Sequence, residues 1–276
     1  MNDRDKIQFM NLSNKYSVAK NLWTTNSLKY MAHVKDALNN LDLENINFED
    51  AVKVCQVVNT NAFDNGVCLK ISRFNHSCFA NAEHFWNEDL KTRDVRAIKN
   101  IKEGEEICLN YQASSSYLTR AERQKNILEL FHFSCHCVAC DLPEQERNQL
   151  DIKCVRYKEL VNKVNMYQMG FEETAGEAFE LLCDKVLICL KEMYKLAKDM
   201  KIVTRLSIIE EILHNGYAVS VSGVRESKCV KRKANFSNDI KTFYNVGLKL
   251  ATILFGETYS ETQVWNKRRN WLLKSE

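Results

Sequence analysis

Arg73-Phe74-Asn75-His76-Ser77-Cys78-Phe79-Ala80-Asn81 is the stretch around which the rest of this sequence is organised. By itself it is a polar loop that carries one cysteine. Two later segments change its meaning: Gly104-Glu105-Glu106-Ile107-Cys108-Leu109-Asn110-Tyr111 and Phe131-His132-Phe133-Ser134-Cys135-His136-Cys137-Val138-Ala139-Cys140. The last segment places three thiols within six residues, a spacing that favours metal binding over ordinary free cysteines in an intracellular chain.

The composition limits the class of protein. The chain has 276 residues, of which 45% are hydrophobic, enough for one large domain or two modest ones. Its 39 basic and 36 acidic residues nearly cancel, so we expect no direct nucleic-acid partner, because such partners usually require a concentrated basic surface. A transcription factor that merely binds zinc is disfavoured for the same reason.

The cysteine content and the start of the chain indicate where it resides. Eleven cysteines is an odd number for a disulfide framework, and the charged start Met1–Lys6 leads into no apolar signal segment. No run approaches the roughly 20 apolar residues that span a membrane. We therefore expect a reducing cytoplasmic or nuclear location and no membrane partner.

Secondary structure follows from periodicity and from the scarcity of helix breakers, since the chain has one proline and eight glycines. The pattern predicts a helical region over about 6–58, in which Val54 and Val58 belong to an apolar side, and a further helix over 117–130 that opens with a Thr119–Glu122 capping box. Alternating segments predict short strands. They cover 66–71, 95–101 and 106–111, and a turn at 102–104 joins the last two.

Beyond Pro143 and the polar run 144–148, a candidate boundary, the sequence is helical almost throughout. Three apolar stripes at helical spacing are best interpreted as packing core, and helical hairpins of this kind often stack in pairs. Gly256 ends the last stripe. The stripes are formed by Phe179, Leu182, Cys183, Val186, Cys189, Leu190 and Met193; by Ile208, Ile209, Ile212 and Leu213; and by Phe243, Val246, Leu250, Ile253 and Leu254. Arg225–Lys233 is basic, which favours a solvated surface over a nuclear localisation signal.

The cysteines of the 135–140 segment suit tetrahedral zinc, which needs four ligands to close a structural site. Three of these ligands are local, so a fourth must come from elsewhere in the chain. Spacing alone does not choose among the candidates, which are Cys78, Cys108, Cys154, His132 and His136.

The three segments, in this order, resemble the second half of a SET domain followed by its post-SET cysteines, as found in the SMYD (SET and MYND) family of protein-lysine methyltransferases. The resemblance covers residues 15–141 and, more loosely, the helical tail. It implies an α+β fold with a partial β-rich SET core, a zinc-bound post-SET segment and an all-helical, TPR-like C-terminal domain. The implied domains are 1–115, with the helical insertion at 6–58, then 116–145 and 146–276.

The resemblance also assigns roles that the residues alone do not specify. A lone tyrosine at a strand end is usually packing, and an Asn-His pair can simply satisfy a turn. In the family, however, the matching positions form a catalytic site, a cofactor site, a substrate channel and a zinc site. The implied residues are Tyr111 for catalysis; Asn75, His76, Ser72 and Phe133 for S-adenosylmethionine; Asn61, Phe63 and Phe131 for the lysine channel; and Cys78, Cys135, Cys137 and Cys140 for structural zinc.

The resemblance therefore predicts an S-adenosylmethionine-dependent protein-lysine methyltransferase, a monomer that acts on a histone or non-histone lysine. The alternative is an inactive SET remnant that serves as a protein-interaction module. That alternative arises because we expect two family parts to be absent, the glycine-rich first strands of the SET domain and the MYND finger. Ala80 is a smaller departure, since the family usually has proline there.

Overall fold

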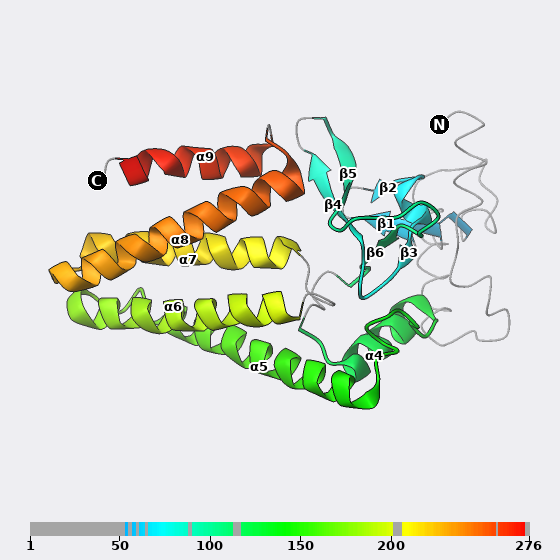
Figure 1. The fold of residues 1–276 in the computed structure, drawn as a ribbon, viewed down its shortest axis with the longest axis horizontal. Coiled ribbons are helices and arrows are strands. Elements are labelled where there is room, and N and C mark those ends of the chain that lie inside the picture. The colour runs from blue at the N-terminus through cyan, green and yellow to red at the C-terminus, as the bar shows by residue number, and fades with distance from the viewer. Residues whose placement is uncertain are drawn as a thin grey trace, which may run out of the picture. The chain divides into compact units, whose positions relative to one another are not determined.

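The computed structural model describes residues 53–54, 57–58, 61–63, 66–87, 90–112, 117–200, 206–257 and 259–273. The chain divides into two compact units, residues 1–75 with 127–134 and residues 76–126 with 135–276. In the described chain, short strands lie between residues 62 and 109, and long helices begin at residue 120 (Figure 1). This confirms the predicted α+β class. The helical region predicted over 6–58 lies outside the described residues except for 53–54 and 57–58, which are helical.

In the first unit, two short strands, β1 (Ala62–Phe63) and β2 (Gly66–Val67), pair antiparallel. A 3-10 turn follows at Ile71–Arg73, so the strand predicted over 66–71 ends early. The prediction for the preceding helical residues was also wrong in detail. Val57 is fully buried, whereas Val54 and Val58, which were assigned to the apolar side, are more than a third exposed.

The remaining strands, between residues 75 and 109, are short and form two separate pairs. β3 (Asn75–His76) pairs with β6 (Cys108–Leu109), and β4 (Ala82–Asn87) pairs antiparallel with β5 (Thr92–Ala97). The register of the second pair runs from Ala82 opposite Ala97 to Asn87 opposite Thr92. The predicted strand over 95–101 is therefore displaced toward the N-terminus, and the predicted strand over 106–111 is reduced to two residues.

Strand β4 was not predicted, because two of its three buried residues are polar and the third is alanine, Ala82. Glu83 is 3% exposed and Asn87 is 7% exposed, so the strand has no apolar alternation along it. Asn87 is satisfied locally, since its side-chain amide donates to Asp94 Oδ2 (3.2 Å) and its oxygen accepts from the Leu90 N–H (3.0 Å). Buried polar side chains with partners on a neighbouring strand are invisible to a search for apolar periodicity.

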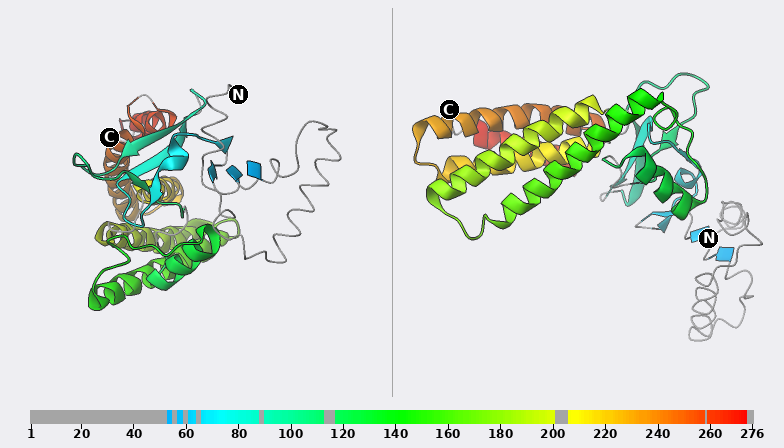
Figure 2. Two further views of the ribbon diagram at one scale, coloured as in Figure 1. Left: turned by 90° about the vertical axis from the view of Figure 1, so that its right-hand side faces the viewer. Right: turned by 90° about the horizontal axis from the view of Figure 1, so that it is seen from below.

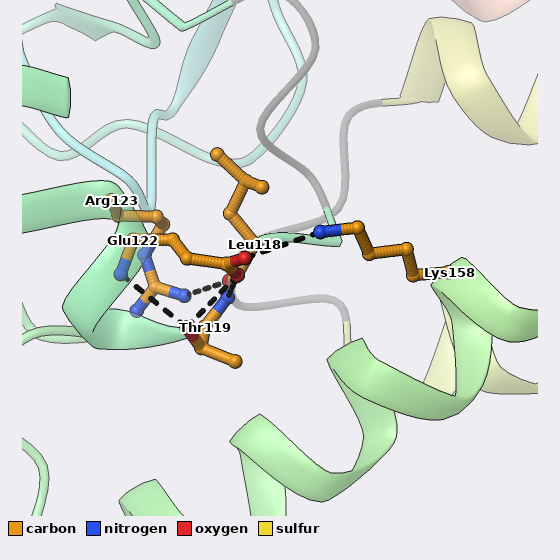
Figure 3. A network of polar contacts seen from close by, with 5 residues as sticks. All are labelled: Leu118, Thr119, Glu122, Arg123 and Lys158. Carbon is orange, nitrogen blue, oxygen red and sulfur yellow. Dashed lines mark hydrogen bonds and ion pairs between the residues drawn. The ribbon is translucent and has the colours of Figure 1, made fainter.

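Two local predictions around the strands and the next helix are confirmed. The turn at 102–104 forms, with the Glu105 N–H donating to the Lys102 carbonyl at 3.0 Å and Gly104 at φ +78°. Helix α4 (Arg120–Phe131) begins directly after Thr119. Thr119 and Glu122 form a reciprocal capping box, in which the Thr119 N–H donates to Glu122 Oε2 (2.9 Å) and the Glu122 N–H donates to Thr119 Oγ1 (3.3 Å) (Figure 3).

Five helices make up the rest of the second unit, and each packs on the next in the chain (Figures 1 and 2). They are α5 (Glu144–Met169), α6 (Gly176–Asp199), α7 (Leu206–Glu226), α8 (Val230–Phe255) and α9 (Ser260–Leu273). Pro143 precedes the first of them, and Gly256, at φ +85°, ends α8 as predicted. None of the described helices is both long and apolar enough to cross a bilayer.

The predicted apolar stripes do form the core of this helical part. Cys183, Val186 and Leu190 of α6 are buried, as are Ile209 and Leu213 of α7. Ile253 was assigned to the third stripe but is 50% exposed, while Ala251 is fully buried. The helix therefore presents a face slightly rotated from the predicted one.

Close helix contacts in this core depend on glycine. Gly216 lies against the ring of Phe243, Gly223 against Phe236, and Gly247 against Trp265. In each case a β-carbon would come closer to the ring than van der Waals contact allows. The aromatic rings fill the space that the missing side chains leave, so these helices approach one another more closely than alanine would permit.

The β4–β5 pair is joined to the end of the helical part. The rings of Phe85 and Phe255 meet edge to face at 5.1 Å, and the Tyr259 hydroxyl donates to Asp94 Oδ2 at 3.2 Å. Arg96 lies beside Gly256 and its guanidinium is 5.8 Å from the Tyr259 ring centre. Strand residues and the α8–α9 corner thus form one continuous packed region.

Candidate functional site

Four cysteines from two distant parts of the sequence meet in the second unit. The sulfur atoms of Cys78, Cys135, Cys137 and Cys140 all lie within 4.8 Å of one another, and all four cysteines are free thiols. Cys78 Sγ and Cys140 Sγ are 3.7 Å apart. A tetrahedron with zinc–sulfur bonds of about 2.3 Å has sulfur–sulfur edges of about 3.8 Å, so the donor set and its spacing fit a structural zinc ion.

The other candidates for the fourth ligand lie outside this group. The buried Cys154 thiol faces Met200 Sδ at 3.8 Å, and the exposed His136 pairs with Asp141 at 3.4 Å. Cys108 is half-buried, and His132 is exposed on the last turn after α4. Among the described residues, Cys78 is therefore the fourth sulfur that the fold brings to the 135–140 segment.

The backbone around the cluster is fixed by a tight turn and by helix α4. The N–H groups of Cys140 and Asp141 both donate to the Cys137 carbonyl, at 2.8 and 3.0 Å. The Gln124 side chain clamps Cys135 from both sides, accepting from its N–H (3.0 Å) and donating to its carbonyl (2.6 Å). Arg120 Nε donates to the Cys140 carbonyl at 2.7 Å. The first turns of α4 therefore position two of the four sulfurs.

The four sulfurs interact strongly because three of them are almost completely buried, with Cys78 and Cys135 each 3% exposed and Cys140 fully buried. Contacts with Cys135, Cys137 and Cys140 raise the pKa of the Cys78 thiol. Hydrogen bonds from Cys137, Cys140 and Cys78 lower the pKa of Cys135. Without a cation, like charges at this separation prevent all four thiols from ionising together.

His76 connects this cluster to Tyr111. The Tyr111 N–H donates to His76 Nδ1 at 3.0 Å, and His76 Nε2 lies 3.4 Å from Cys78 Sγ. Because Nδ1 accepts a hydrogen bond, the neutral ring carries its proton on Nε2, where the proton points toward a sulfur that would be a thiolate in a zinc site. The two rings also meet at 5.2 Å. One side chain thus ties the backbone of Tyr111 to a candidate zinc ligand.

Asn81 holds the same loop to the strand that leads to Tyr111. Its side-chain amide donates to the Glu106 carbonyl (2.9 Å) and to Glu105 Oε1 (3.0 Å), and its oxygen accepts from the Cys108 N–H (2.9 Å). The Ser77 N–H adds a bond to the Leu109 carbonyl at 3.0 Å. Asn81 is 6% exposed, so these bonds are sheltered from water.

Tyr111 is half-buried beside these groups. Burial first, and then the neighbouring Cys108 and Glu106, raise the pKa of its phenol. The hydroxyl therefore remains protonated at neutral pH and can donate and accept hydrogen bonds without carrying charge.

The remaining predicted cofactor and channel residues belong to the first unit, apart from His76. Asn61 is buried, and its amide donates to the Val57 carbonyl at 2.8 Å. Ser72 Oγ donates to the Asn61 carbonyl at 2.9 Å. Asn75 is exposed on β3. Three aromatic side chains, those of Phe63, Phe131 and Phe133, are half-buried. Their roles toward a cofactor or a lysine stay predictions.

Three residues that contact the cluster or the Tyr111 strand were given no role from the sequence: Asn81, Arg123 and Gln124. Asn81 ends the central stretch, and its position at a loop end was the available signal. Arg123 and Gln124 lie in a helix with many charged residues, where the sequence pattern favours a solvated face. Arg123 is instead 1% exposed.

Comparison with known proteins matches part of this chain to one domain family. Residues 4–112 match the family model of the SET domain. Over 95 residues the chain is 39% identical to the histone-lysine N-methyltransferase set5 of Schizosaccharomyces pombe. This aligned segment covers 34% of this chain and 28% of that protein. Over 89 residues it is 35% identical to the human protein-lysine N-trimethyltransferase SMYD5, covering 32% of this chain and 21% of that protein.

A SET and MYND domain-containing protein of Dictyostelium discoideum is 33% identical over 75 residues, covering 27% of this chain and 14% of that protein. The aligned segments thus span less than a third of each of these curated relatives.

Proposed function

We propose that this chain, which carries a SET domain of the SMYD type, transfers methyl groups from S-adenosylmethionine to lysine side chains of proteins. The observation that carries the proposal is the arrangement around His76, which joins Tyr111 to the four-cysteine cluster through its two ring nitrogens. The names of the relatives, which are protein-lysine and histone-lysine methyltransferases, support the same reaction.

The donor supplies a methyl group bound to a positively charged sulfur, and the chain must orient an uncharged lysine amine in line with it. Such a displacement depends mainly on proximity and alignment. We assign Tyr111 the task of orienting the amine through its neutral, half-buried hydroxyl. A half-buried setting also disfavours the charged form of the lysine that enters it.

The residues proposed for the cofactor suit a polar and aromatic ligand. Asn75, exposed on β3, and the adjacent His76 offer polar groups, and Ser72 offers a hydroxyl. Phe133 offers a half-buried ring for the adenine. We assign Asn61, Phe63 and Phe131 to the lysine channel.

The zinc ion that Cys78, Cys135, Cys137 and Cys140 would hold has a structural task. A closed shell of four thiolates leaves no position for a water molecule, so the ion stabilises the fold and takes no part in the reaction. It would fix the loop that carries His76 to the segment that follows α4.

The proposal is tested on the zinc-loaded chain by calorimetric titration with S-adenosylmethionine, followed by transfer of labelled methyl groups to histones and to a panel of lysine peptides. We expect Asn75→Ala to weaken cofactor binding, and Tyr111→Phe to abolish transfer while cofactor binding persists. Tyr117→Phe is the matched control, because Tyr117 stacks on Tyr157 at 5.5 Å and has no assigned role in the reaction. Transfer by Tyr111→Phe at the rate of the unaltered chain would refute the assignment of Tyr111.

The second candidate function is a non-catalytic protein-interaction module. One face of α5 favours it, where Ile152 (69% exposed) and Val155 (48% exposed) line a surface groove of about 570 Å³ together with charged neighbours. A chain that binds zinc but neither binds S-adenosylmethionine nor transfers methyl groups would favour this module. A histone substrate would require a nuclear location, which is one of the two locations that the sequence predicts.

A further inference from the structure

Helix α4 buries a positive charge beside the cysteine cluster. Arg123 is 1% exposed, and one of its guanidinium nitrogens, Nη1, donates to the Leu118 carbonyl at 2.7 Å (Figure 3). The buried Nε and Nη2 groups complete no hydrogen bond within the described part of the chain. A buried guanidinium is costly unless an anion compensates it, so its counter-charge has to be identified.

The acidic residue next to Arg123 is not its partner. Glu122 Oε2 accepts hydrogen bonds from the Thr119 N–H and the Thr119 hydroxyl, both at 2.9 Å. Glu122 Oε1 pairs with Lys158 Nζ of α5 at 3.2 Å. Figure 3 shows this carboxylate occupied by Thr119 and Lys158, while the guanidinium turns to Leu118. Both carboxylate oxygens are thus used by other groups.

The negative groups that act on Arg123 are sulfurs. Arg123 lies on the same face of α4 as Arg120 and Gln124, whose side chains bind the backbones of Cys140 and Cys135. The cysteines whose negative charge would stabilise its guanidinium are Cys78, Cys140 and Cys154. Two of these three cysteines belong to the four-sulfur cluster. A zinc ion with four thiolates carries a net charge of −2, which a nearly closed interior cannot stabilise without a cation.

We propose that Arg123 is the counter-ion of the zinc–thiolate cluster, a positioning residue outside the shell of ligands. The positive charge of the Arg123 guanidinium would offset the negative charge of the zinc–thiolate cluster on the side where Cys140 lies. This inference rests on the proposed zinc site and adds to it the residue that makes four thiolates tolerable in a buried place. Residues outside the ligand shell of a metal typically change metal affinity by about 10–100-fold.

The local structure around Arg123 holds it in place. The capping box fixes the start of α4, and the Arg120 N–H donates to Asp151 Oδ1 of α5 at 2.7 Å. Arg120 and Gln124, one turn apart on the helix that carries Arg123, bind the backbone of Cys140 and Cys135. Helix α4 therefore supplies both the backbone support and the charge of the site.

The test compares Arg123→Gln, which removes the charge, with Arg123→Lys, which retains it. Zinc affinity is measured in the whole chain by competition with a chromophoric chelator, and cobalt substitution reports four-thiolate coordination through its absorption spectrum. We expect Arg123→Gln to bind zinc about 10–100-fold more weakly and Arg123→Lys to recover most of the loss. Arg156→Gln is the matched control, since Arg156 pairs on the surface with Glu192 at 2.7 Å.

A second measurement separates charge from packing. Unfolding of each variant is followed with zinc and with excess chelator under reducing conditions. A counter-ion role predicts that Arg123→Gln destabilises the zinc-loaded chain more than the chelated chain, because neutral thiols need no cation. Equal destabilisation in both states, loss of helix signal in both, or unchanged zinc affinity would overturn the inference.

The results of these zinc-binding and unfolding measurements do not depend on the proposed methyl transfer. An unaltered chain that binds zinc and shows the expected difference between the variants, yet transfers no methyl group, would retain the counter-ion and refute the methyltransferase. An unaltered chain that binds no zinc would refute the counter-ion together with the zinc site.

Discussion

The strand-rich part around the cysteines and the helical part from α5 to α9 are held together by different means. The described strands there are two or six residues long. Side-chain–backbone hydrogen bonds hold this part together: those of Asn81 reach the segment 106–108, and that of Gln124 joins α4 to Cys135. The helical part instead packs large buried side chains, with Trp265, Phe236 and Leu213 almost completely inaccessible to water. The first part depends on polar links and on a candidate metal, the second on apolar area.

Each part is therefore vulnerable to a different kind of change. Two-residue strands bury too little surface to be stable alone, so a cross-link between distant loops has a large effect there. Close-packed helices tolerate loss of any one polar link but not a change of volume at a glycine contact. Loss of metal and a change of side-chain volume should therefore affect the two parts differently.

Removal of zinc has the largest expected effect and is confined to the strand-rich part. Structural zinc contributes an apparent binding free energy of about 10–16 kcal/mol in zinc-finger peptides, more than a single side chain supplies. With excess chelator and reductant, we expect amide hydrogen exchange to lose protection at 76–81, 105–111 and 135–141. Protection in α6, α7 and α8 should persist. Uniform loss across both parts would show that they form one cooperative unit and are not stabilised separately.

Gly247→Ala should destabilise the helical part and leave the cysteine site intact. A β-carbon at this position would overlap the ring of Trp265, which is fully buried and cannot move away. Overpacking of this kind costs about 1–3 kcal/mol and sometimes more. We expect urea unfolding, followed by far-UV circular dichroism, to shift to lower urea, while the cobalt spectrum of the cysteine site stays unchanged.

Gly104→Ala is the matched control in the strand-rich part. Gly104 has φ +78°, but a β-carbon there would meet no neighbouring atom. Its cost comes from backbone strain alone, about 1–2 kcal/mol, and falls on the turn that precedes the Asn81 contacts. A Gly247→Ala chain that unfolds at the same urea concentration as the unaltered chain would contradict the packing that we describe around Trp265.

The sequence could predict the features that depend on neighbours in the chain. The Thr119–Glu122 capping box, the turn at 102–104 and the stop at Gly256 each involve residues close in sequence, and the structure confirms all three. The apolar faces of α6 and α7 follow from periodicity for the same reason. Three of the cluster's sulfurs were indicated by spacing, whereas only the family resemblance selected Cys78.

The features that depend on distant partners were missed or misplaced. Strand β4 buries Glu83 and Asn87, whose polar character predicts exposure, and Asn87 finds its partner in Asp94 on the neighbouring strand. Arg123 lies among charged residues that predict exposure, yet it is 1% exposed on the face of α4 that binds the backbones of Cys140 and Cys135. Ile253 fits the apolar stripe of α8, but contact with α7 and α9 decides which face is covered. In each case the deciding interaction comes from another element.

Thr119→Ala has the smallest expected effect and lies between the two parts. Loss of a threonine N-cap costs about 1 kcal/mol. Glu122 loses the bond from the Thr119 hydroxyl but keeps the bond from the backbone N–H of residue 119 and the ion pair with Lys158 of α5. We expect a small decrease in the free energy of unfolding and a slight weakening of zinc binding, because the first turn of α4 carries Arg120, Arg123 and Gln124. Calorimetric unfolding and chelator competition on the same samples measure both quantities.

Thr242→Ala provides the control for the substitution itself. Thr242 is exposed within α8, where its hydroxyl donates to the Asn238 carbonyl at 3.0 Å. Alanine has the higher helix propensity, so this change should be neutral or slightly stabilising and should leave zinc binding unaltered. If Thr119→Ala also left zinc binding unaltered while lowering stability, α4 would belong energetically to the helical part. A joint decrease would instead identify α4 as the element through which helix packing supports the cysteine site.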